Sequence, residues 1–185
     1  MCSAVSALSS SAASQDARAS RRPTLKSPVV GVVGATGAVG VEMVQCLEKR
    51  RFPLSSLRLF ASARSAGQRV TYAGNSLVVE ELREDALEGI DIALFAAGGS
   101  ISRRFAPLMA AAGTIVVDNS SAFRMASEVP LVVPEINSQA IRAHRGIIAN
   151  PNCAAILTIT PLWPIHRINP LQRLIVSTYQ AASGA

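Results

Sequence analysis

Aromatic residues make up only 4% of this 185-residue sequence, and charged residues only 16%. Lysine and arginine outnumber the acidic residues and give a formal net charge of +6. These cations form no continuous basic stripe, however, and no aromatic residues are interleaved with them. Proteins that bind nucleic acid usually show such a stripe. We therefore expect no nucleic-acid partner.

Cysteine is also scarce, and the three cysteines, Cys2, Cys46 and Cys153, lie far apart. An odd, scattered set forms neither a disulfide framework nor a metal knuckle, so we expect a reducing compartment and no bound metal. No stretch approaches the roughly 20 consecutive apolar residues of a membrane span, so we expect no membrane association. Apolar residues, 49% of the chain, recur instead in short runs that are typical of buried parallel strands.

The first 27 residues differ in composition from the rest. They are rich in serine and alanine, contain arginine, and include Asp16 as their one acidic residue. This composition is typical of an organellar transit peptide, and the abundant serine favours the chloroplast. The alternatives are a mitochondrial or cytoplasmic protein, and a disordered tail without a targeting role.

From Pro28 onward, strand and helix patterns alternate with short connections. We predict strands near residues 29–33, 57–62, 70–72, 77–79, 91–99, 114–121, 146–149 and 171–180. Helical spacing is found at 38–49, Ser102 is placed to cap a helix that runs to about residue 112, and a short helix is expected at 137–143. The alternation predicts an α/β fold with a Rossmann-like, doubly wound parallel sheet over residues 28–152.

The first strand and helix are joined by a glycine-rich turn, Gly34, Gly37 and Gly40 in "GATGAVG". Glycine permits a tight turn and lets the backbone approach a pyrophosphate, while the first turn of the helix offers free N–H groups to the anion. The pattern predicts a dinucleotide site, and the alternative is a turn that only packs closely. The second strand is followed by Ser62, Arg64 and Ser65 without an acid, which favours NADP over NAD.

One cysteine stands where a loop becomes a helix, in "ANPNCAAILT". Asn152 is a good helix cap, so Cys153 lies in the first turn, where the helix dipole and free N–H groups favour a nucleophilic thiolate. The alternative is a packed structural cysteine. Cys46, in mid-helix among apolar neighbours, is expected to belong to the core. Neither His144 nor His166 is a convincing base for Cys153.

Taken together, these residues resemble one family. The segments "GATGAVG", "ASARSAG", "AAGGSISRRFAP", "VDNSSAFRM", "VPLVVPEIN", "ANPNC" and "VSTYQAASGA" have the order and spacing of aspartate-semialdehyde dehydrogenase. The resemblance covers essentially everything from Val29 to Ala185. N-acetyl-γ-glutamyl-phosphate reductase, of the same superfamily, is the nearest alternative.

The resemblance implies reduction of L-aspartyl-4-phosphate by NADPH to L-aspartate 4-semialdehyde and phosphate, a step in the synthesis of Lys, Thr, Met and Ile. By resemblance, Cys153 forms a thioester, Gln180 positions the substrate or attacking group, and Arg124 holds the substrate's phosphate. The cofactor positions implied in the same way are Thr36, Gly37, Ala38 and Val39 at the pyrophosphate, Arg64 and Ser65 at the 2′-phosphate, and Ser183 and Gly184 near the nicotinamide. The resemblance also implies that the full-length enzyme is a homodimer or homotetramer.

The sequence departs from the family at two places. Ala154 and Ala155 stand where members usually have hydroxyl residues, which could reduce activity. Residues 153–185 match only the start of the family's α+β substrate and dimerisation domain, so the sequence predicts a shortened chain with little or no turnover by itself. The alternative role is that of an NADP-binding or interaction module that catalyses nothing.

Overall fold

A computed structural model describes residues 27–179. The predicted transit peptide up to residue 26, and the predicted site residues Gln180, Ser183 and Gly184, lie outside the described part. The strands are β1 (Val29–Val33), β2 (Ser56–Ala61), β3 (Arg69–Tyr72), β4 (Asn75–Glu81), β5 (Ile92–Phe95), β6 (Ile115–Asp118) and β7 (Ile147–Ala149). The helices are α2 (Ala38–Lys49), α3 (Gly99–Ala111), α4 (Pro134–Asn137) and α5 (Cys153–Ile168), with 3₁₀ turns η1 (Glu84–Ala86) and η2 (Ser138–Ala143).

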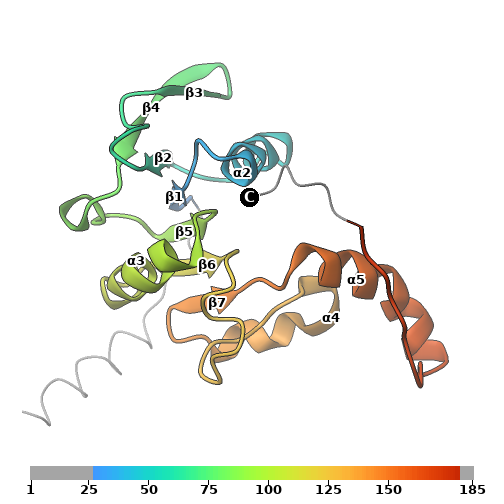
Figure 1. Cartoon of the computed structure of the whole chain (residues 1–185). Coiled ribbons are helices and arrows are strands. Elements are labelled where there is room, and N and C mark those ends of the chain that lie inside the picture. Colours follow the sequence, from blue (N-terminus) through green and yellow to red (C-terminus); the bar gives the residue numbers. More distant parts are fainter. Residues whose placement is uncertain (1–26, 180–185) are drawn as a thin grey trace, which may run out of the picture.

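The strands form one seven-stranded sheet in the order β3-β4-β2-β1-β5-β6-β7 (Figure 1). Every pairing is parallel except that of β3 with β4, a hairpin closed by Ala73 and Gly74. Both turn residues have positive φ, 48° and 79°, as a two-residue hairpin loop requires. Without β3, the strands follow the doubly wound order with its switch point between β1 and β5. The predicted fold class is confirmed.

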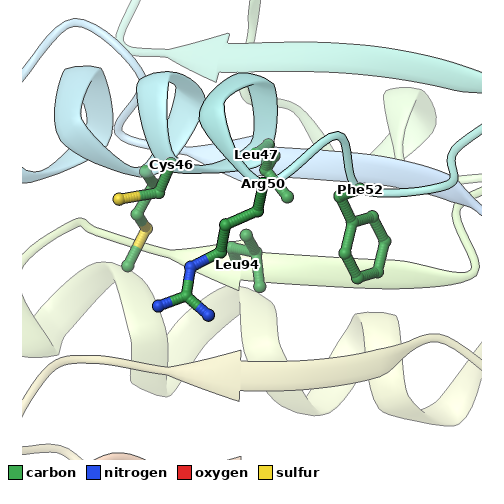
Figure 2. Close-up of a pocket in the computed structure, with 6 residues that line it drawn as sticks. Cys46, Leu47, Arg50, Phe52 and Leu94 are labelled. Atoms are coloured by element: carbon green, nitrogen blue, oxygen red, sulfur yellow. The ribbon is translucent and has the colours of Figure 1, made fainter.

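The helix α2 covers one face of the sheet (Figure 1). Its buried residues, Gly40, Val44 and Leu47, recur at helical spacing, and Val44 and Leu47 pack in one cluster with Val30 and Val32 of β1. Cys46 falls outside this spacing and is exposed, so the expectation that it belongs to the core is wrong. Its side chain borders an apolar hollow between α2 and β5, where Figure 2 shows it near Leu47, Arg50, Phe52 and Leu94.

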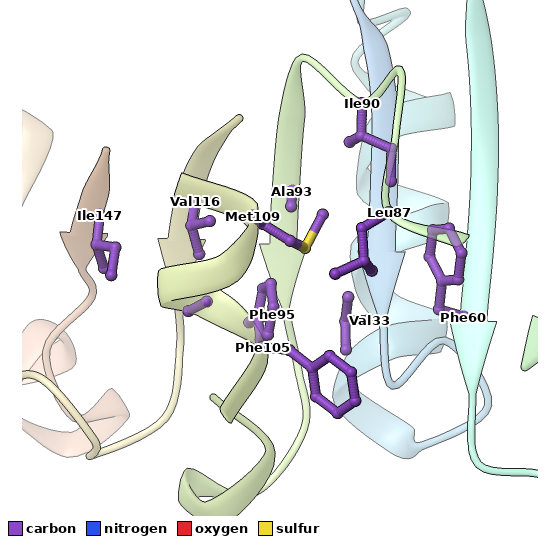
Figure 3. Packing of buried hydrophobic residues seen from close by; sticks show 11 residues of the cluster. Val33, Phe60, Leu87, Ile90, Ala93, Phe95, Phe105, Met109, Val116 and Ile147 are labelled. Carbon is purple, nitrogen blue, oxygen red and sulfur yellow. The ribbon is translucent and has the colours of Figure 1, made fainter. Parts of the chain in front are cut away.

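The helix α3 covers the opposite face, where the larger side chains gather. Figure 3 shows Phe105 and Met109 of α3 lying against Phe95 of β5, with Phe60 of β2 at one side and Ile147 of β7 at the other. In the central strands β1, β2 and β5, neighbouring residues point into different cores, one on each face, as pleating requires.

Two predicted elements differ from the structure. The helix α3 begins at Gly99 with Gly98 as its N-cap, so Ser102 is not a cap. Ser102 lies inside the helix, fully buried, and donates a hydrogen bond to Asp118. Residues 171–179 form no strand, and all of them are exposed. An extended segment needs a neighbouring strand to satisfy its backbone groups, and none pairs with it in the described part.

The helix α5, unlike α2 and α3, has no buried residue along its sixteen positions. It lies near α4 and contains Pro161 and Pro164, each of which removes a backbone hydrogen bond. Within residues 27–179, no helix combines the length and apolarity needed to cross a membrane.

Candidate active site

The first and third glycines of the turn after β1, Gly34 and Gly40, are packed so tightly that a side chain would not fit. A Cβ on Gly34 would lie 3.0 Å from the backbone of Ala96 and Ala97, and φ of Gly34 is +86°. A Cβ on Gly40 would lie 2.1 Å from the carbonyl oxygen of Gly34. The first and third glycines therefore hold β1, α2 and the end of β5 in close contact, as the dinucleotide pattern requires.

The middle glycine faces solvent. Gly37 is exposed and is the N-cap of α2, and no side chain caps the helix. Ala38 and Val39, in the first turn, are also exposed. Because the exposed turn offers N–H groups that no side chain of residues 27–179 caps, these residues fit a pyrophosphate. Thr36, beside them, is half-buried.

The turn is joined directly to the end of β2. The amide nitrogens of Gly34 and Ala35 both donate to the carbonyl oxygen of Phe60, at 2.8 and 3.1 Å. Arg64 follows four residues later in an exposed turn, in which the Ser65 amide donates to the carbonyl of Ser62. Arg64 has no ion-pair partner among residues 27–179, so its guanidinium is available to an anion.

Similar backbone hydrogen bonds join the ends of the remaining parallel strands across the sheet. The Ala96 amide donates to Val33 O, and the Asn119 amide donates to Phe95 O. The Asn150 amide donates to Asp118 O, at 2.8 Å. Hydrogen bonds thus link the carboxyl-terminal ends of neighbouring strands, from β2 through β1, β5 and β6 to β7. We call this side of the sheet the carboxyl edge. In doubly wound sheets ligands bind at this edge.

Cys153 lies at the same edge, as the first residue of α5. The Asn152 side chain accepts a hydrogen bond of 2.9 Å from the Ala154 amide, which confirms the predicted cap. The Cys153 side chain is exposed in the described part of the chain. Pro151, just before the cap, is buried and anchors the turn.

Neither histidine is placed to act as a base for this thiol. His144 precedes β7 whereas Cys153 follows it, so the two residues lie at opposite ends of the strand. His144 Nδ1 accepts a hydrogen bond of 3.0 Å from the Gly146 amide. His166 is also on α5, but thirteen residues along a helix correspond to roughly 20 Å. Its ring stacks on Trp163, with centroids 5.8 Å apart.

Arg124 is held beside the turn that precedes Cys153. Its Nε donates to Asn150 O and its Nη2 donates to Asn119 O, both at 2.9 Å. The side chain is half-buried. The predicted phosphate-binding arginine is therefore brought near the predicted nucleophile, although two of its donors are used by backbone carbonyls.

The sequence did not predict the hydrogen-bonded polar residues at the ends of β6 and β7, next to Arg124. Asp118, at the end of β6, is fully buried and accepts from Ser102 Oγ at 2.8 Å and from Ser120 N and Oγ at 3.0 and 2.7 Å. Asn119 Oδ1 accepts from the side-chain amide of Asn150. The available signal was the polar run "DNSS" directly after an apolar strand.

The sheet order, the glycine turn and the ligand-facing carboxyl edge together define a dinucleotide-binding domain of the Rossmann type. The family profile described as "Semialdehyde dehydrogenase, NAD binding domain" matches residues 29–144. The chain belongs to this semialdehyde dehydrogenase family.

Individual relatives agree with the family assignment. The chain is 51% identical over 144 residues to the aspartate-semialdehyde dehydrogenase of Synechocystis, covering 78% of this chain and 43% of that protein. For the Bacillus subtilis enzyme the identity is 53% over 144 residues, covering 78% and 42%. A crystal structure of aspartate semialdehyde dehydrogenase II from Vibrio cholerae, complexed with ASA, matches with a TM-score of 0.74 and 44% identity, covering 76% of this chain and 47% of that one. The chain thus spans less than half the length of these relatives.

Proposed function

We propose that this chain forms the nucleotide-binding and thiol-bearing part of an NADPH-dependent aspartate-semialdehyde dehydrogenase, which converts L-aspartyl-4-phosphate into L-aspartate 4-semialdehyde and phosphate. The observation that carries the proposal is the placement of Cys153 at a capped helix start, on the same carboxyl edge as the glycine turn. The relatives with 51% and 53% identity bear the name of this enzyme.

The nucleotide fits the residues at the carboxyl edge. The uncapped start of α2 suits the pyrophosphate, and the exposed Arg64 with Ser65 suits a 2′-phosphate, since a guanidinium grips phosphate through paired hydrogen bonds. Ser183 and Gly184, beyond the described residues, are proposed for the nicotinamide end. When bound, NADPH would supply the hydride that reduces the acyl group.

The chain's own residues supply the covalent chemistry. The Cys153 sulfur would attack the acyl carbon of aspartyl phosphate, forming a C–S bond while the C–O bond to phosphate breaks and phosphate leaves with its electron pair. Arg124 would hold that phosphate, and Gln180, outside the described residues, would position the substrate. After reduction of the thioester the C–S bond breaks, which releases the aldehyde and restores the thiolate.

The test is a turnover assay with matched cysteine variants. Residues 1–185 are joined to the remaining part of the Synechocystis relative, and NADPH oxidation is followed with aspartyl phosphate or N-acetyl-γ-glutamyl phosphate. We expect turnover with aspartyl phosphate, its loss in Cys153→Ser, and its retention in Cys46→Ser, since Cys46 lies away from the carboxyl edge. Turnover by the Cys153→Ser protein would refute the role of the thiol, and preference for the glutamyl substrate would favour the related reductase.

Residues 1–185 by themselves have a second candidate role. Because the chain spans less than half of its relatives and α5 has no fully buried residue, we propose that it binds NADPH without turnover. Fluorescence titration with NADPH together with labelling of Cys153 tests this: binding with a fast-reacting thiol supports a competent half-site, whereas binding with an inert thiol supports an interaction module.

We also propose a plastid location and a homodimeric or homotetrameric full-length enzyme. The location rests on the composition of residues 1–27, rich in serine and alanine with one acid. A fluorescent protein carrying residues 1–27 should enter chloroplasts, and a fusion with Arg18, Arg21 and Arg22 changed to glutamate should stay outside. Entry into mitochondria alone would correct the assignment.

A further inference from the structure

The loop after β6 and the turn before Cys153 are tied together at both backbone and side chains. The Asn150 amide donates to Asp118 O at 2.8 Å, and the Asn150 side chain donates to Asn119 Oδ1. Arg124 adds two bonds, from Nε to Asn150 O and from Nη2 to Asn119 O. The guanidinium thus spans both segments.

The base of this arrangement is firmly attached to the core. Asp118 is fully buried, and its carboxylate receives hydrogen bonds from Ser102 on α3 and from the amide and hydroxyl of Ser120. The Ser120 hydroxyl in turn accepts from the Ala122 amide at 3.0 Å. Because α3 and β6 hold the start of the loop, Arg124, six residues after Asp118, reaches the turn from an anchored segment.

We propose that Arg124 is a positioning residue for Cys153, which clamps the turn Asn150–Asn152 onto the loop after β6. The two donors in use, Nε and Nη2, lie on one edge of a planar fork, and an ammonium group cannot reproduce that pairing. For Nη1 no hydrogen-bond partner is found among the described residues 27–179. A substrate anion can therefore bind Nη1 while the clamp stays closed, so anion binding and thiol placement share one side chain.

The anion-binding part of this inference rests on the proposed function, but the clamp is tested without substrate or nucleotide. In residues 1–185 carrying Cys2→Ser and Cys46→Ser, Cys153 is the single thiol. Amide hydrogen exchange of Asn150 and Ala154 and the rate of Cys153 alkylation by iodoacetamide are compared for the parent, Arg124→Met and Arg124→Lys. Arg142→Met, at an exposed arginine on η2, is the matched control.

We expect Arg124→Met to speed exchange of the Asn150 and Ala154 amides by on the order of ten-fold, since two charge-assisted hydrogen bonds are lost from a local structure. The alkylation rate should change several-fold, methylguanidinium should restore both readouts, and Arg142→Met should change neither. Arg124→Lys, which keeps the charge but not the fork, should resemble Arg124→Met more than the parent.

Unchanged exchange and alkylation in Arg124→Met would overturn the proposal and leave Arg124 as an anion-binding residue only. If thermal unfolding shows that the Arg124→Met protein does not fold, the Arg124→Lys protein is used in its place. Exchange of the Asn150 and Ala154 amides in Arg124→Lys at the parent rate would then overturn the proposal. Because neither readout needs turnover, failure of the proposed reaction leaves this result standing. Conversely, loss of turnover in Arg124→Met with an unaltered turn supports the reaction and refutes the clamp.

Discussion

At the scale of single residues, the site depends on places where a side chain is missing as much as on those where one is present. Gly40 lies in the first turn of α2, where alanine is ordinarily the better helix former by about 1 kcal/mol. Here, however, a Cβ would lie 2.1 Å from Gly34 O, which is backbone and cannot rotate away. The close contact outweighs the helix propensity.

We therefore expect Gly40→Ala to lower the free energy of unfolding by about 2 kcal/mol, because α2 must shift away from the turn. Urea unfolding followed by circular dichroism measures the change. Gly98→Ala is the control, since Gly98 has φ −66° and no atom within 4 Å of an added Cβ. An unaltered midpoint for Gly40→Ala would contradict the packing described for this turn.

Arg64 offers a second test at this scale. If it binds a 2′-phosphate, Arg64→Met should raise the Kd for NADPH roughly ten-fold, the effect of losing a charge-assisted hydrogen bond, and leave the Kd for NADH unchanged. Fluorescence titration gives both constants. Arg145→Met, at another exposed arginine, should alter neither. An equal loss for both nucleotides would show that Arg64 does not recognise the 2′-phosphate.

At the scale of elements, the start of α5 is the critical feature. Asn152 provides its side-chain cap, and the prolines at 161 and 164 weaken the helix further along. The first turn therefore depends on the cap and on the anchored residue Pro151 before it. This turn is also the one that orients backbone N–H groups around Cys153.

Asn152→Ala should destabilise the first turn of α5 by about 1 kcal/mol and slow alkylation of Cys153, because a frayed turn no longer holds its backbone N–H groups in place around the sulfur. The rate is measured in the background where Cys153 is the single thiol. Asn169→Ala, at the opposite end of the same helix, is the matched control. Alkylation at the parent rate would mean that the helix start does not activate the sulfur.

At the scale of the whole molecule, the two ends of the described chain behave differently. Residues 29–149 bury two cores against one sheet, whereas α5 and the segment after it expose large apolar side chains. Leu157 is 75% exposed, Ile168 88% and Ile175 85%. Clustered exposed apolar surface promotes association.

Residues 1–185 are therefore expected to self-associate in a concentration-dependent way, and Leu157→Gln with Ile168→Gln should reduce this. Sedimentation velocity at several concentrations measures it. Leu108→Gln, at a 42% exposed position on α3, should have little effect. A chain that stays monodisperse at all concentrations would contradict the expectation.

The sequence by itself determined the features that depend on neighbouring residues. The alternation of short apolar runs with helical spacing predicted the sheet, three glycines predicted the turn, and Asn152 before Cys153 predicted the capped start of α5. The tertiary structure decided what depends on residues far apart in the chain. The bond between Ser102 and Asp118 buries a serine that its local pattern presents as a cap. Residues 171–179 find no strand to pair with in the described part of the chain. Arg124 meets Asn150 across 26 positions, because only the parallel sheet brings the ends of β6 and β7 to one edge.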